Sequence, residues 1–465
     1  MKKQPVMERR REIMKKSLGI DYKQFESGSI AFDYEAMMAQ AGYPLDEVRQ
    51  IQQRAGVGNT PLIELKNLST LSRSLSPKGK GARIFIKDEA SNPSGSFKAR
   101  RASVSIHHAA KMGFQCVAAA TSGNYGAAVA SQAAMKGLDC IIVQECYDSQ
   151  GKGQPEIIEK ARKCEAFGAE VIQLSVGPEL FAVFLEILEE TGAFNASLYT
   201  PFGIAGVETL GWEIAQQCQR TLGRFPDAVV ATNAGGGNLT GTARGLRAAG
   251  ATQTQIIGAS VNLTGLHMAS DQHFNRKSFT TGHTGFGMPF ATWPDRSDVP
   301  RSAGRPLRYM DRYLTVAQGE VFWATEALAR LEGLERGPAG NTSLAAALGM
   351  AREMDEDAIL VVQETEYTGA GKHVAPQLSF ARENGIQIRI GNPREEVPGE
   401  SIILPSSMSQ ILPQDADLAA MSRSLIRRAV AGKERASITS EDRQFLAAET
   451  RQDEAFVTKV LEEVL

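Results

Sequence analysis

KDEASNPSGSFKAR, residues 87–100, leads from one predicted element into the next. The run RIFIK (83–87) is predicted to be a strand, and residues 96–113 are predicted to form a helix. Lys98 then lies in the first turn of that helix, where the helix dipole disfavours a cation by roughly 0.3–1 kcal/mol. Such a position helps to lower the pKa of an amine toward that of a usable nucleophile. A solvated helix lysine is the alternative, and this turn alone does not decide between the two.

A second turn of the same kind is TSGNYGAAVA, residues 121–130, where a predicted strand meets a glycine-rich helix start. Backbone N–H groups of residues 122–126 are expected to converge on an anion there, and the helix dipole favours a carboxylate. The side-chain amide of Asn124 adds a donor for a phenolate oxygen. The alternative is an ordinary strand-to-helix turn that uses Ser and Asn as caps.

A third turn, DAVVATNAGGGNLTGTARG (227–245), leads a predicted strand through three successive glycines into a helix. The amides of residues 235–239 are therefore able to approach a phosphate closely. The run is not a G-x-G-x-x-G motif with the acidic residue of a dinucleotide site, and it lacks the lysine of a nucleotide triphosphate loop. A cofactor phosphate monoester, held without lysine or metal, fits this turn better.

Strand-like and Ala-rich helical stretches alternate along the chain from Gly56 onward. Repeated strand–helix–strand units predict an α/β fold with open, mostly parallel sheets and helices on both faces. Two such series, connected near residues 200–206, predict two sheets with a cleft between them. The predicted divisions are an N-terminal helical extension (1–55), a large domain (56–95 plus 205–395), a small domain (96–204) and a C-terminal helical tail (396–465).

Composition favours a small-molecule enzyme. A net charge of −2 over 465 residues gives no field for nucleic acid or an anionic membrane. The N-terminal segment is charged and lacks an apolar secretory core, and no stretch approaches the ~18 apolar residues of a membrane span, so we expect a cytoplasmic protein. The cysteines form no C-x-x-C pair and predict neither a disulfide framework nor a metal site; they are Cys116, Cys140, Cys146, Cys164 and Cys218.

The order of four motifs carries a family resemblance: GNTPLIEL (58–65), NPSGSFKAR (92–100), TSGNYG (121–126) and AGGGN (234–238). In this order they resemble the fold type II enzymes that depend on pyridoxal 5'-phosphate (PLP). That family includes threonine synthase, threonine and serine dehydratases, diaminopropionate ammonia-lyase and cysteine synthase. The resemblance implies PLP as cofactor, an amino-acid substrate and a two-domain fold like that of the tryptophan synthase β chain.

The resemblance also implies roles for single residues. Lys98 matches the lysine that holds PLP as a Schiff base, and Asn124 matches the asparagine that hydrogen-bonds the 3-oxygen of the pyridine ring. The loop that grips the substrate carboxylate is matched by Ser122, Gly123, Asn124, Tyr125 and Gly126. The phosphate cradle is matched by Gly235, Gly236, Gly237, Asn238 and Leu239.

A hydroxyl partner for the pyridine nitrogen is expected after the late strand AILVVQE, in the run TEYTGAGKH (365–373). Similarity of T-G-A-G to the T-G-x-G of threonine synthase favours Thr368, whereas the length of the strand favours Thr365. Both remain candidates. A neutral hydroxyl partner leaves the ring nitrogen largely unprotonated, so the cofactor is a weaker electron sink than in aminotransferases.

Two features depart from a simple dehydratase. The family motif usually continues S-F-K-x-R-G, whereas this chain has Arg100 and Arg101. The N-terminal extension is also long, and a Pro/Gly-rich stretch carries five arginines. The sequences SGSFKARRA (94–102) and QETEYTGAGKH (363–373) resemble those of the β-subunit family of the 2-amino-4-ketopentanoate thiolases.

We expect the arginines of the Pro/Gly-rich stretch to contact coenzyme A phosphates or a partner subunit, with a solvated loop as the alternative; they are Arg296, Arg301, Arg305, Arg308 and Arg312.

This closer resemblance implies cleavage of 2-amino-4-oxopentanoate by coenzyme A to acetyl-CoA and alanine, in ornithine degradation. It further implies a smaller α subunit as partner, along with homo-oligomer contacts. One alternative is β-elimination or γ-replacement, as in threonine dehydratase, diaminopropionate ammonia-lyase or threonine synthase, because the same site residues serve those reactions. The other alternative is a regulatory subunit that retains the cofactor but catalyses no reaction.

Overall fold

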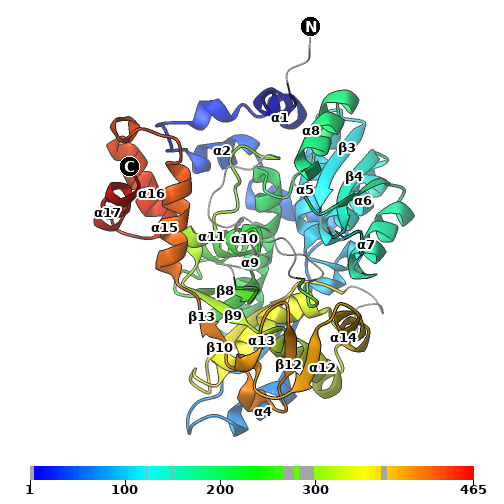
Figure 1. Cartoon of the computed structure of the whole chain (residues 1–465), viewed down its shortest axis with the longest axis vertical. Coiled ribbons are helices and arrows are strands. Elements are labelled where there is room, and N and C mark those ends of the chain that lie inside the picture. The colour runs from blue at the N-terminus through cyan, green and yellow to red at the C-terminus, as the bar shows by residue number, and fades with distance from the viewer. Residues whose placement is uncertain are drawn as a thin grey trace.

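The fold is known from a computed structural model, which places two separate sheets on either side of the central part of the molecule (Figure 1). Helix α1 (Arg10–Leu18) lies beside the smaller sheet, and the C-terminus ends a group of helices beside the larger one. The structure describes residues 5–121, 123–148, 150–153, 155–177, 179–264, 277–281, 298–367 and 374–465.

The larger sheet has seven strands in the order β1-β2-β10-β7-β8-β9-β13. Its five central strands are parallel to one another, and the two edge strands run antiparallel to their neighbours. The central strands read as nearly continuous apolar runs because both faces of a parallel sheet are covered. The strands are β1 (Leu62–Glu64), β2 (Arg83–Asp88), β7 (Ala228–Thr232), β8 (Gln255–Val261), β9 (Arg312–Val316), β10 (Ile359–Glu364) and β13 (Gln414–Asp415).

Successive residues of these strands serve two different cores. Phe85 and Val361 pack with one set of helices, whereas Ile86 and Val362 pack with the other set. This alternation follows from the two-residue period of a strand. The first set contains α9 (Pro201–Leu222), α10 (Gly237–Ala248), α15 (Leu418–Ala429), α16 (Ser440–Thr450) and α17 (Glu454–Val464). The second set contains α4 (Lys66–Ser74), α12 (Gln318–Glu332) and α13 (Pro338–Ala351).

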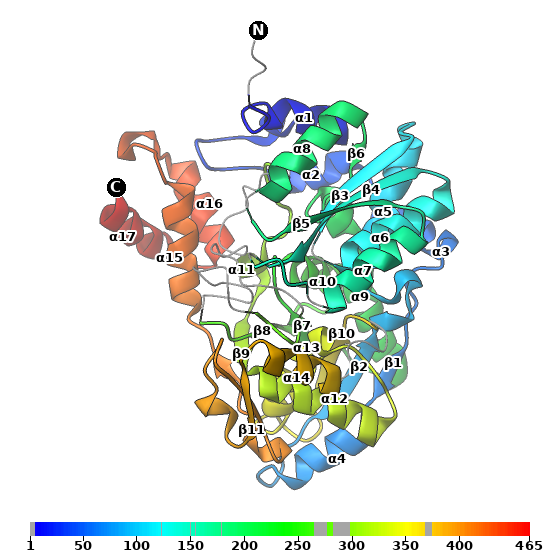
Figure 2. The same ribbon diagram turned by 45° about the vertical axis from the view of Figure 1, so that its right-hand side comes forward.

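The smaller sheet has four parallel strands in the order β5-β4-β3-β6. Small and branched residues fill its centre, and one of the helices around it, residues 124–136, is Ala-rich on its inner side. Figure 2 shows α5, α6 and α7 beside these strands, with α8 above them. The elements are β3 (Cys116–Thr121), β4 (Asp139–Tyr147), β5 (Glu170–Ser175), β6 (Phe194–Asn195), α5 (Lys98–Lys111), α6 (Asn124–Lys136), α7 (Pro155–Ala166) and α8 (Glu179–Thr191).

The N-terminal extension packs on the body of the same chain. Its helices are α1 (Arg10–Leu18), α2 (Tyr34–Ala41) and α3 (Leu45–Arg54). Helix α1 contacts α8 and β6, while α2 and α3 contact α9. Met14, Phe32 and Met37 are buried in the core of the smaller sheet. The apolar side of the extension is therefore largely occupied within this chain.

The segment after residue 364 adds small elements around the larger sheet. Helix α14 (Val374–Glu383) precedes a two-stranded parallel sheet of β11 (Gln387–Ile390) and β12 (Ser401–Leu404). Earlier in the chain, the short helix α11 (Pro306–Tyr309) precedes β9.

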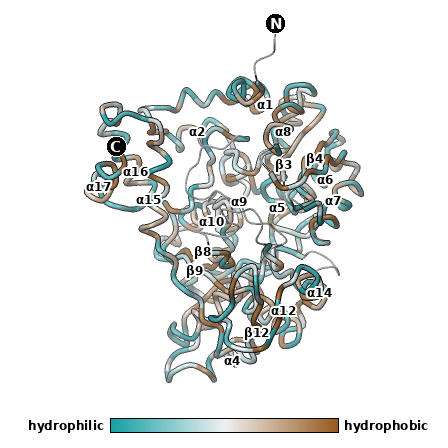
Figure 3. Tube along the Cα trace, viewed as in Figure 1, coloured by the Kyte–Doolittle hydropathy of each residue, from teal (hydrophilic) through white to brown (hydrophobic). Residues whose placement is uncertain are grey.

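Figure 3 shows apolar segments concentrated inside the molecule and polar segments along many of its outer loops and helices. Among the helices of the described residues, none has the length and apolar character needed to span a bilayer.

The predicted α/β class with mostly parallel sheets is confirmed. The connection near residues 200–206 is the start of α9, because Pro201 takes the first helical position and the Thr200 hydroxyl accepts from the Gly203 N–H. The tail expected to be helical also contributes two short strands: β12, which pairs with the nearby β11, and β13, which pairs with the distant β9. The division of the chain into four parts stays a prediction.

Candidate active site

The turn that follows β2 places Lys98 at the start of α5, as the sequence predicts. Two short 3₁₀ turns, residues 89–91 and 93–95, reverse the chain after the strand. Phe97 N–H then donates to the carbonyl oxygen of Thr365 over 3.0 Å, which fixes this turn against the end of β10. The carboxyl ends of β2 and β10 therefore meet at Lys98, the edge of a parallel sheet at which ligands usually bind.

The amine of Lys98 lies in a cavity, 4.3 Å from the centroid of the Phe97 ring. Burial, with the charges of Arg101 and Lys160, holds the pKa of Lys98 well below the usual lysine range, and the charge of Glu366 opposes this only in part. A cation loses hydration when it is buried, and neighbouring cations disfavour it further. Lys98 is thus poised to be neutral and nucleophilic.

The turn between β3 and α6 brings Asn124 and Tyr125 to the same cavity. The Thr121 hydroxyl accepts hydrogen bonds from the N–H groups of Gly123, over 3.0 Å, and Gly126, over 3.3 Å. The amides of Asn124 and Tyr125 belong to the first turn of α6, where the helix supplies no acceptor. These two amides suit an anion better than those of Gly123 and Gly126, which the turn itself uses.

Gly126 lies away from the cavity. A Cβ atom on it would stand 2.9 Å from the Ile142 side chain and 3.3 Å from the Cys164 sulfur. The glycine therefore allows α6 to pack closely against β4 and α7. Its predicted contact with substrate stays a prediction, and Ser122 lies outside the described residues.

The turn between β7 and α10 has no room for side chains. A Cβ on Gly235 would overlap the Tyr199 hydroxyl, and one on Gly236 would overlap the Pro306 ring. Gly236 also has a φ of +81°, which glycine adopts at no steric cost. Helix α10 begins at Gly237, so the first N–H groups of this helix point out of its end as an anion site.

Asn238 adds polar groups to the same turn. Its side chain is buried, and within the described part of the chain neither its amide oxygen nor its amide nitrogen has a hydrogen-bond partner. Buried polar groups are almost always hydrogen-bonded, so an unpartnered pair at an anion site indicates a ligand. A narrow, backbone-lined cradle of this kind fits a phosphate monoester.

The structure brings most of the predicted site residues together around one cavity. Leu239 is buried inside α10 and does not line that cavity. Thr365 does line it, whereas Thr368 lies outside the described residues. The predicted residues on the cavity wall are Lys98, Gly123, Asn124, Tyr125, Gly235, Gly236, Gly237, Asn238 and Thr365.

Arg100 belongs to an ionic cluster whose members do not line the cavity. Its guanidinium contacts both oxygens of Glu89, at 2.7 and 2.8 Å, and both oxygens of Glu213, at 3.0 and 2.8 Å. The Lys87 amine also bonds Glu213 over 2.8 Å. Burial alone lowers the pKa of Arg100, but the two carboxylates outweigh it and raise that pKa.

Arg101 lines the cavity itself, next to Lys98, and it is a residue to which the sequence assigned no role. The available signal was its departure from the glycine of the S-F-K-x-R-G motif. Lys160 and Glu366 also line the cavity and were missed, since no motif marks them. Lys160 bonds the Glu156 carboxylate over 2.7 Å, so it already has an acidic partner.

The arginines of the Pro/Gly-rich stretch form internal contacts. Arg305 forms an ion pair with the buried Glu449 and stacks over Tyr34 at 4.1 Å. Arg308 also approaches Glu449, at 3.4 Å, and Arg312 bonds both oxygens of Asp415. A buried carboxylate of the tail thus pairs with Arg305 and Arg308, whereas the pair of Arg312 and Asp415 is exposed. Arg301 stacks over Phe32, and Arg296 lies outside the described residues.

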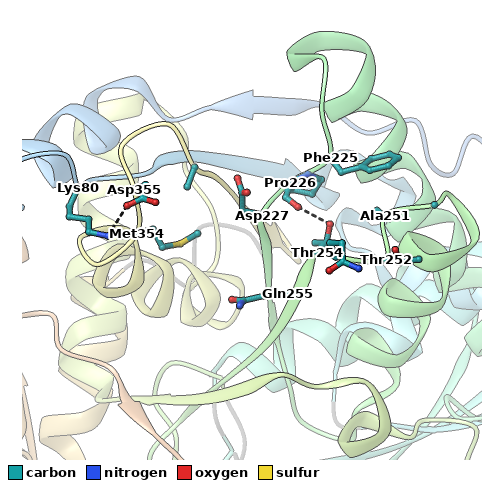
Figure 4. A pocket seen from close by; sticks show the side chains of 13 residues that line it. Lys80, Phe225, Pro226, Asp227, Ala251, Thr252, Thr254, Gln255, Met354 and Asp355 are labelled. Carbon is teal, nitrogen blue, oxygen red and sulfur yellow. Dashed lines mark hydrogen bonds and ion pairs between the residues drawn. The ribbon is translucent and has the colours of Figure 1, made fainter.

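Another hollow lies at the opposite end of the large sheet, where the central strands begin (Figure 4). Two of the charged groups drawn there, Lys80 and Asp355, bond each other over 2.7 Å. The Thr254 hydroxyl donates to the carbonyl oxygen of Pro226 over 2.7 Å. These contacts fix the beginnings of the strands. The cavity that contains Lys98 lies instead at the carboxyl ends of the strands.

A family model described as "Pyridoxal-phosphate dependent enzyme" matches residues 54–364, more than half of the chain. The chain belongs to this family. PLP is its cofactor, and the cavity with Lys98, the glycine cradle and unpartnered Asn238 fits a phosphorylated pyridine aldehyde. The chain is also 67% identical over 459 residues to the 2-amino-4-ketopentanoate thiolase beta subunit of Acetoanaerobium sticklandii, and the match spans 99% of this chain and 98% of that protein.

Solved structures agree with the fold. The crystal structure of a threonine deaminase from T.th. superposes with a TM-score of 0.53 at 26% identity, covering 70% of this chain and 98% of that one. Serine racemase from Dictyostelium discoideum superposes with a TM-score of 0.55 at 17% identity, covering 70% and 99% respectively, and this likeness concerns the fold alone. The PLP enzyme thus shares its core architecture with fold type II enzymes.

Proposed function

We propose that this chain is the β subunit of a 2-amino-4-ketopentanoate thiolase, which uses coenzyme A to cleave 2-amino-4-oxopentanoate into acetyl-CoA and alanine. The observation that carries the proposal is the 67% identity to a thiolase β subunit along nearly the whole chain, tail and extension included. Fold alone does not decide function, so the argument depends on this identity and on the site.

The reaction balances without an oxidant or reductant. The sulfur of coenzyme A forms a bond to C4 of the substrate, and the C3–C4 bond breaks. The electron pair of that bond stays on C3, which takes up the proton given by the thiol and becomes the methyl group of alanine. PLP, when bound, supplies an electron sink conjugated to the amino-acid carbon.

Lys98 is the residue that we assign to cofactor attachment and to proton transfer. Its depressed pKa, caused by burial and by Arg101 and Lys160, leaves its amine neutral over a wider pH range than an ordinary lysine. A neutral amine in the cavity is able to accept the proton at C2 and to deliver a proton at C3. A single base that serves both carbons suits a cleavage in which no proton is lost overall.

The remaining wall residues orient the reacting groups. The first amides of α10, at Gly237 and Asn238, hold the cofactor phosphate. Asn124 donates to the ring oxygen, and Thr365 is the described candidate for the ring nitrogen. The first amides of α6 receive the substrate carboxylate, which the dipole of that helix favours.

We further propose that thiolysis requires a smaller α subunit. The similar protein from A. sticklandii is named a beta subunit, which supports a second chain in this enzyme as well. The sequence has no second phosphate-cradling motif that is free to hold coenzyme A. The partner is therefore expected to supply at least part of the coenzyme A site.

The test is to mix the purified chain with the product of a neighbouring open reading frame and to supply 2-amino-4-oxopentanoate with coenzyme A. We expect acetyl-CoA and alanine in equal amounts from the mixture, and little from either chain alone. Lys98→Ala in the same mixture serves as the negative control. Coenzyme-independent ammonia release from serine, threonine or diaminopropionate by this chain alone would instead place it in the elimination class.

A further inference from the structure

Arg101 is a buried cation that has no acidic partner among the described residues. Only 1% of the residue is exposed. One terminal nitrogen of its guanidinium donates to the carbonyl oxygen of Leu198 over 3.2 Å, and Nε is without a hydrogen-bond partner in the described part of the chain. Burial lowers the pKa of Arg101, which shows how little the protein compensates its charge.

The guanidinium of Arg101 lies directly at the glycine cradle. A Cβ atom built on Gly237 would stand 2.8 and 3.0 Å from its two terminal nitrogens. The rings of Phe97 and Tyr199 flank it, with centroids at 5.4 and 5.7 Å. Arg101 follows Lys98 by three residues on α5, so both side chains project from the same face of this helix into the cavity.

An isolated ionised group in a protein interior is costly unless it is paired, and arginine remains protonated at any ordinary pH. No carboxylate of the described residues completes this site, and the anion of a ligand would do so. The planar guanidinium fork matches phosphate oxygens in pairs, and the first amides of α10 point at the same place. We propose that Arg101 binds the 5'-phosphate of PLP together with the amides of Gly237 and Asn238.

This inference rests on the cofactor site proposed above, and it changes the expected chemistry of that site. The sequence predicts a phosphate held by backbone groups alone, whereas Arg101 adds a full positive charge beside the cradle. The position is a glycine in the usual S-F-K-x-R-G motif, so the contact is particular to chains that carry arginine there. The substrate carboxylate is expected at the start of α6 instead.

The experiment compares PLP with pyridoxal, which is the same aldehyde without the phosphate. The apoprotein and its Arg101→Gln variant are titrated with each compound, and binding is followed by absorbance. At a pH where Lys98 is neutral in both proteins, we expect the variant to bind PLP about 10- to 100-fold more weakly, as for loss of a charged hydrogen bond, while its affinity for pyridoxal changes less than about threefold. Arg247→Gln, which removes an exposed arginine at the far end of α10, is the matched control and should leave both affinities unchanged.

A second readout follows the phosphate itself. Phosphorus NMR of the holoprotein reports the ionisation of the 5'-phosphate, and loss of the neighbouring cation should raise the pKa of that group in Arg101→Gln. Equal losses of PLP and pyridoxal binding, or an unchanged PLP affinity, would overturn the assignment of Arg101. If Arg101→Gln does not fold, Arg101→Lys gives the same comparison, because an ammonium lacks the bidentate fork and should weaken PLP more than pyridoxal.

The role of Arg101 and the position of the cofactor site can be tested separately. Borohydride reduction of PLP-loaded Arg101→Gln, followed by peptide mapping, shows where the cofactor is attached. Label on Lys98 with an unchanged PLP affinity would reject the role of Arg101 and keep the cofactor site. Label on a different lysine in the parent protein would reject the cofactor site itself.

Discussion

Arg100 and Arg101 are consecutive, equally buried and differently used. Arg100 contacts two carboxylates, Glu89 and Glu213, with hydrogen bonds to all four oxygens. Arg101, one position further along α5, points to the cavity and has no acidic partner among the described residues. A step of one residue turns the side chain by about 100° around a helix, which takes it from one region to the other.

The contrast shows how a fold separates structural charge from functional charge. The Arg100 cluster is neutralised by the chain itself, so it stabilises the connection between β2, α5 and α9 whether or not a ligand is bound. The cavity contains a cation and a nucleophilic amine whose charges the described residues compensate only in part. Perturbed groups of the second kind mark functional sites.

The largest expected effect belongs to Lys98. Lys98→Ala removes the attachment point and the base together, so turnover should fall by about 10³-fold or more, since a single base alone contributes about 10²- to 10⁴-fold. The free energy of unfolding should change little, because the side chain ends in a cavity. Steady-state assay of the two-subunit mixture and chemical denaturation of the variant measure both quantities. A variant with near-parental turnover would remove Lys98 from the mechanism.

The next effect is on stability and concerns Glu213. Glu213→Gln takes a carboxylate from Arg100 and Lys87, and breaking a buried ion pair costs about 3–5 kcal/mol. Arg101→Met should leave the apoprotein as stable as the parent or more stable, since it removes an unpaired buried charge. Denaturant unfolding of both apoproteins makes this comparison. Similar losses in the two variants would contradict the distinction between the two arginines.

Gly236→Ala is expected to have an intermediate effect. A non-glycine residue at a φ of +81° costs roughly 1–2 kcal/mol, and the added Cβ would overlap the Pro306 ring. We expect weaker PLP binding and a lower midpoint of thermal unfolding. Gly250→Ala is the matched control for strain without crowding, because its φ is +88° and its Cβ would stand 3.9 Å from the Phe225 ring. Equal effects of both substitutions on PLP affinity would contradict the assignment of the glycine turn to the PLP phosphate.

A smaller effect concerns pH. Burial, Arg101 and Lys160 depress the pKa of Lys98, so the neutral amine forms as the pH rises through that lowered value. Arg101→Gln removes one of the two cations, so the pKa of Lys98 should move back toward its usual range. The rate of pyridoxal incorporation into the apoprotein should then rise at a higher pH than in the parent. A profile that stays in place or moves to lower pH would show that Arg101 does not act on Lys98.

The smallest effect is expected at the surface. Arg312 and Asp415 form an exposed pair that joins β9 to β13, and such pairs are worth about 0–1 kcal/mol. Arg312→Gln should therefore change the free energy of unfolding by less than about 1 kcal/mol and leave PLP binding unchanged. Coenzyme A dependence of the two-subunit assay is measured on the same variant. A large rise in its Michaelis constant for coenzyme A would restore the predicted contact between this arginine and the coenzyme.

Local sequence patterns predicted the elements and the turns well. Strand β3 leads into the predicted turn at residues 121–130, and Lys98 opens α5, because runs of apolar residues and helix-start signals act over a few positions. The roles assigned to Asn124 and to the cradle stay predictions, although the structure brings these residues to one cavity.

Contacts between distant segments were beyond the reach of the sequence. Glu213 lies 113 residues from Arg100, and Glu449 lies 144 residues from Arg305, so no local pattern indicates either pair. For the same reason, the sequence did not distinguish Arg100, which pairs with carboxylates, from Arg101, which lines the cavity. The short strand β13 was also missed, since its two residues acquire their form from pairing with β9.

The most direct test of the account is reduction of the holoenzyme with borohydride followed by tryptic peptide mapping. Two lysines, Lys98 and Lys160, line the described part of the cavity, and the second is already bonded to Glu156. The account predicts the pyridoxyl mass on the peptide of residues 88–100, which contains Lys98 at a cleavage site that the modification blocks. Pyridoxyl mass on the peptide that contains Lys160, or on any other lysine, would contradict it.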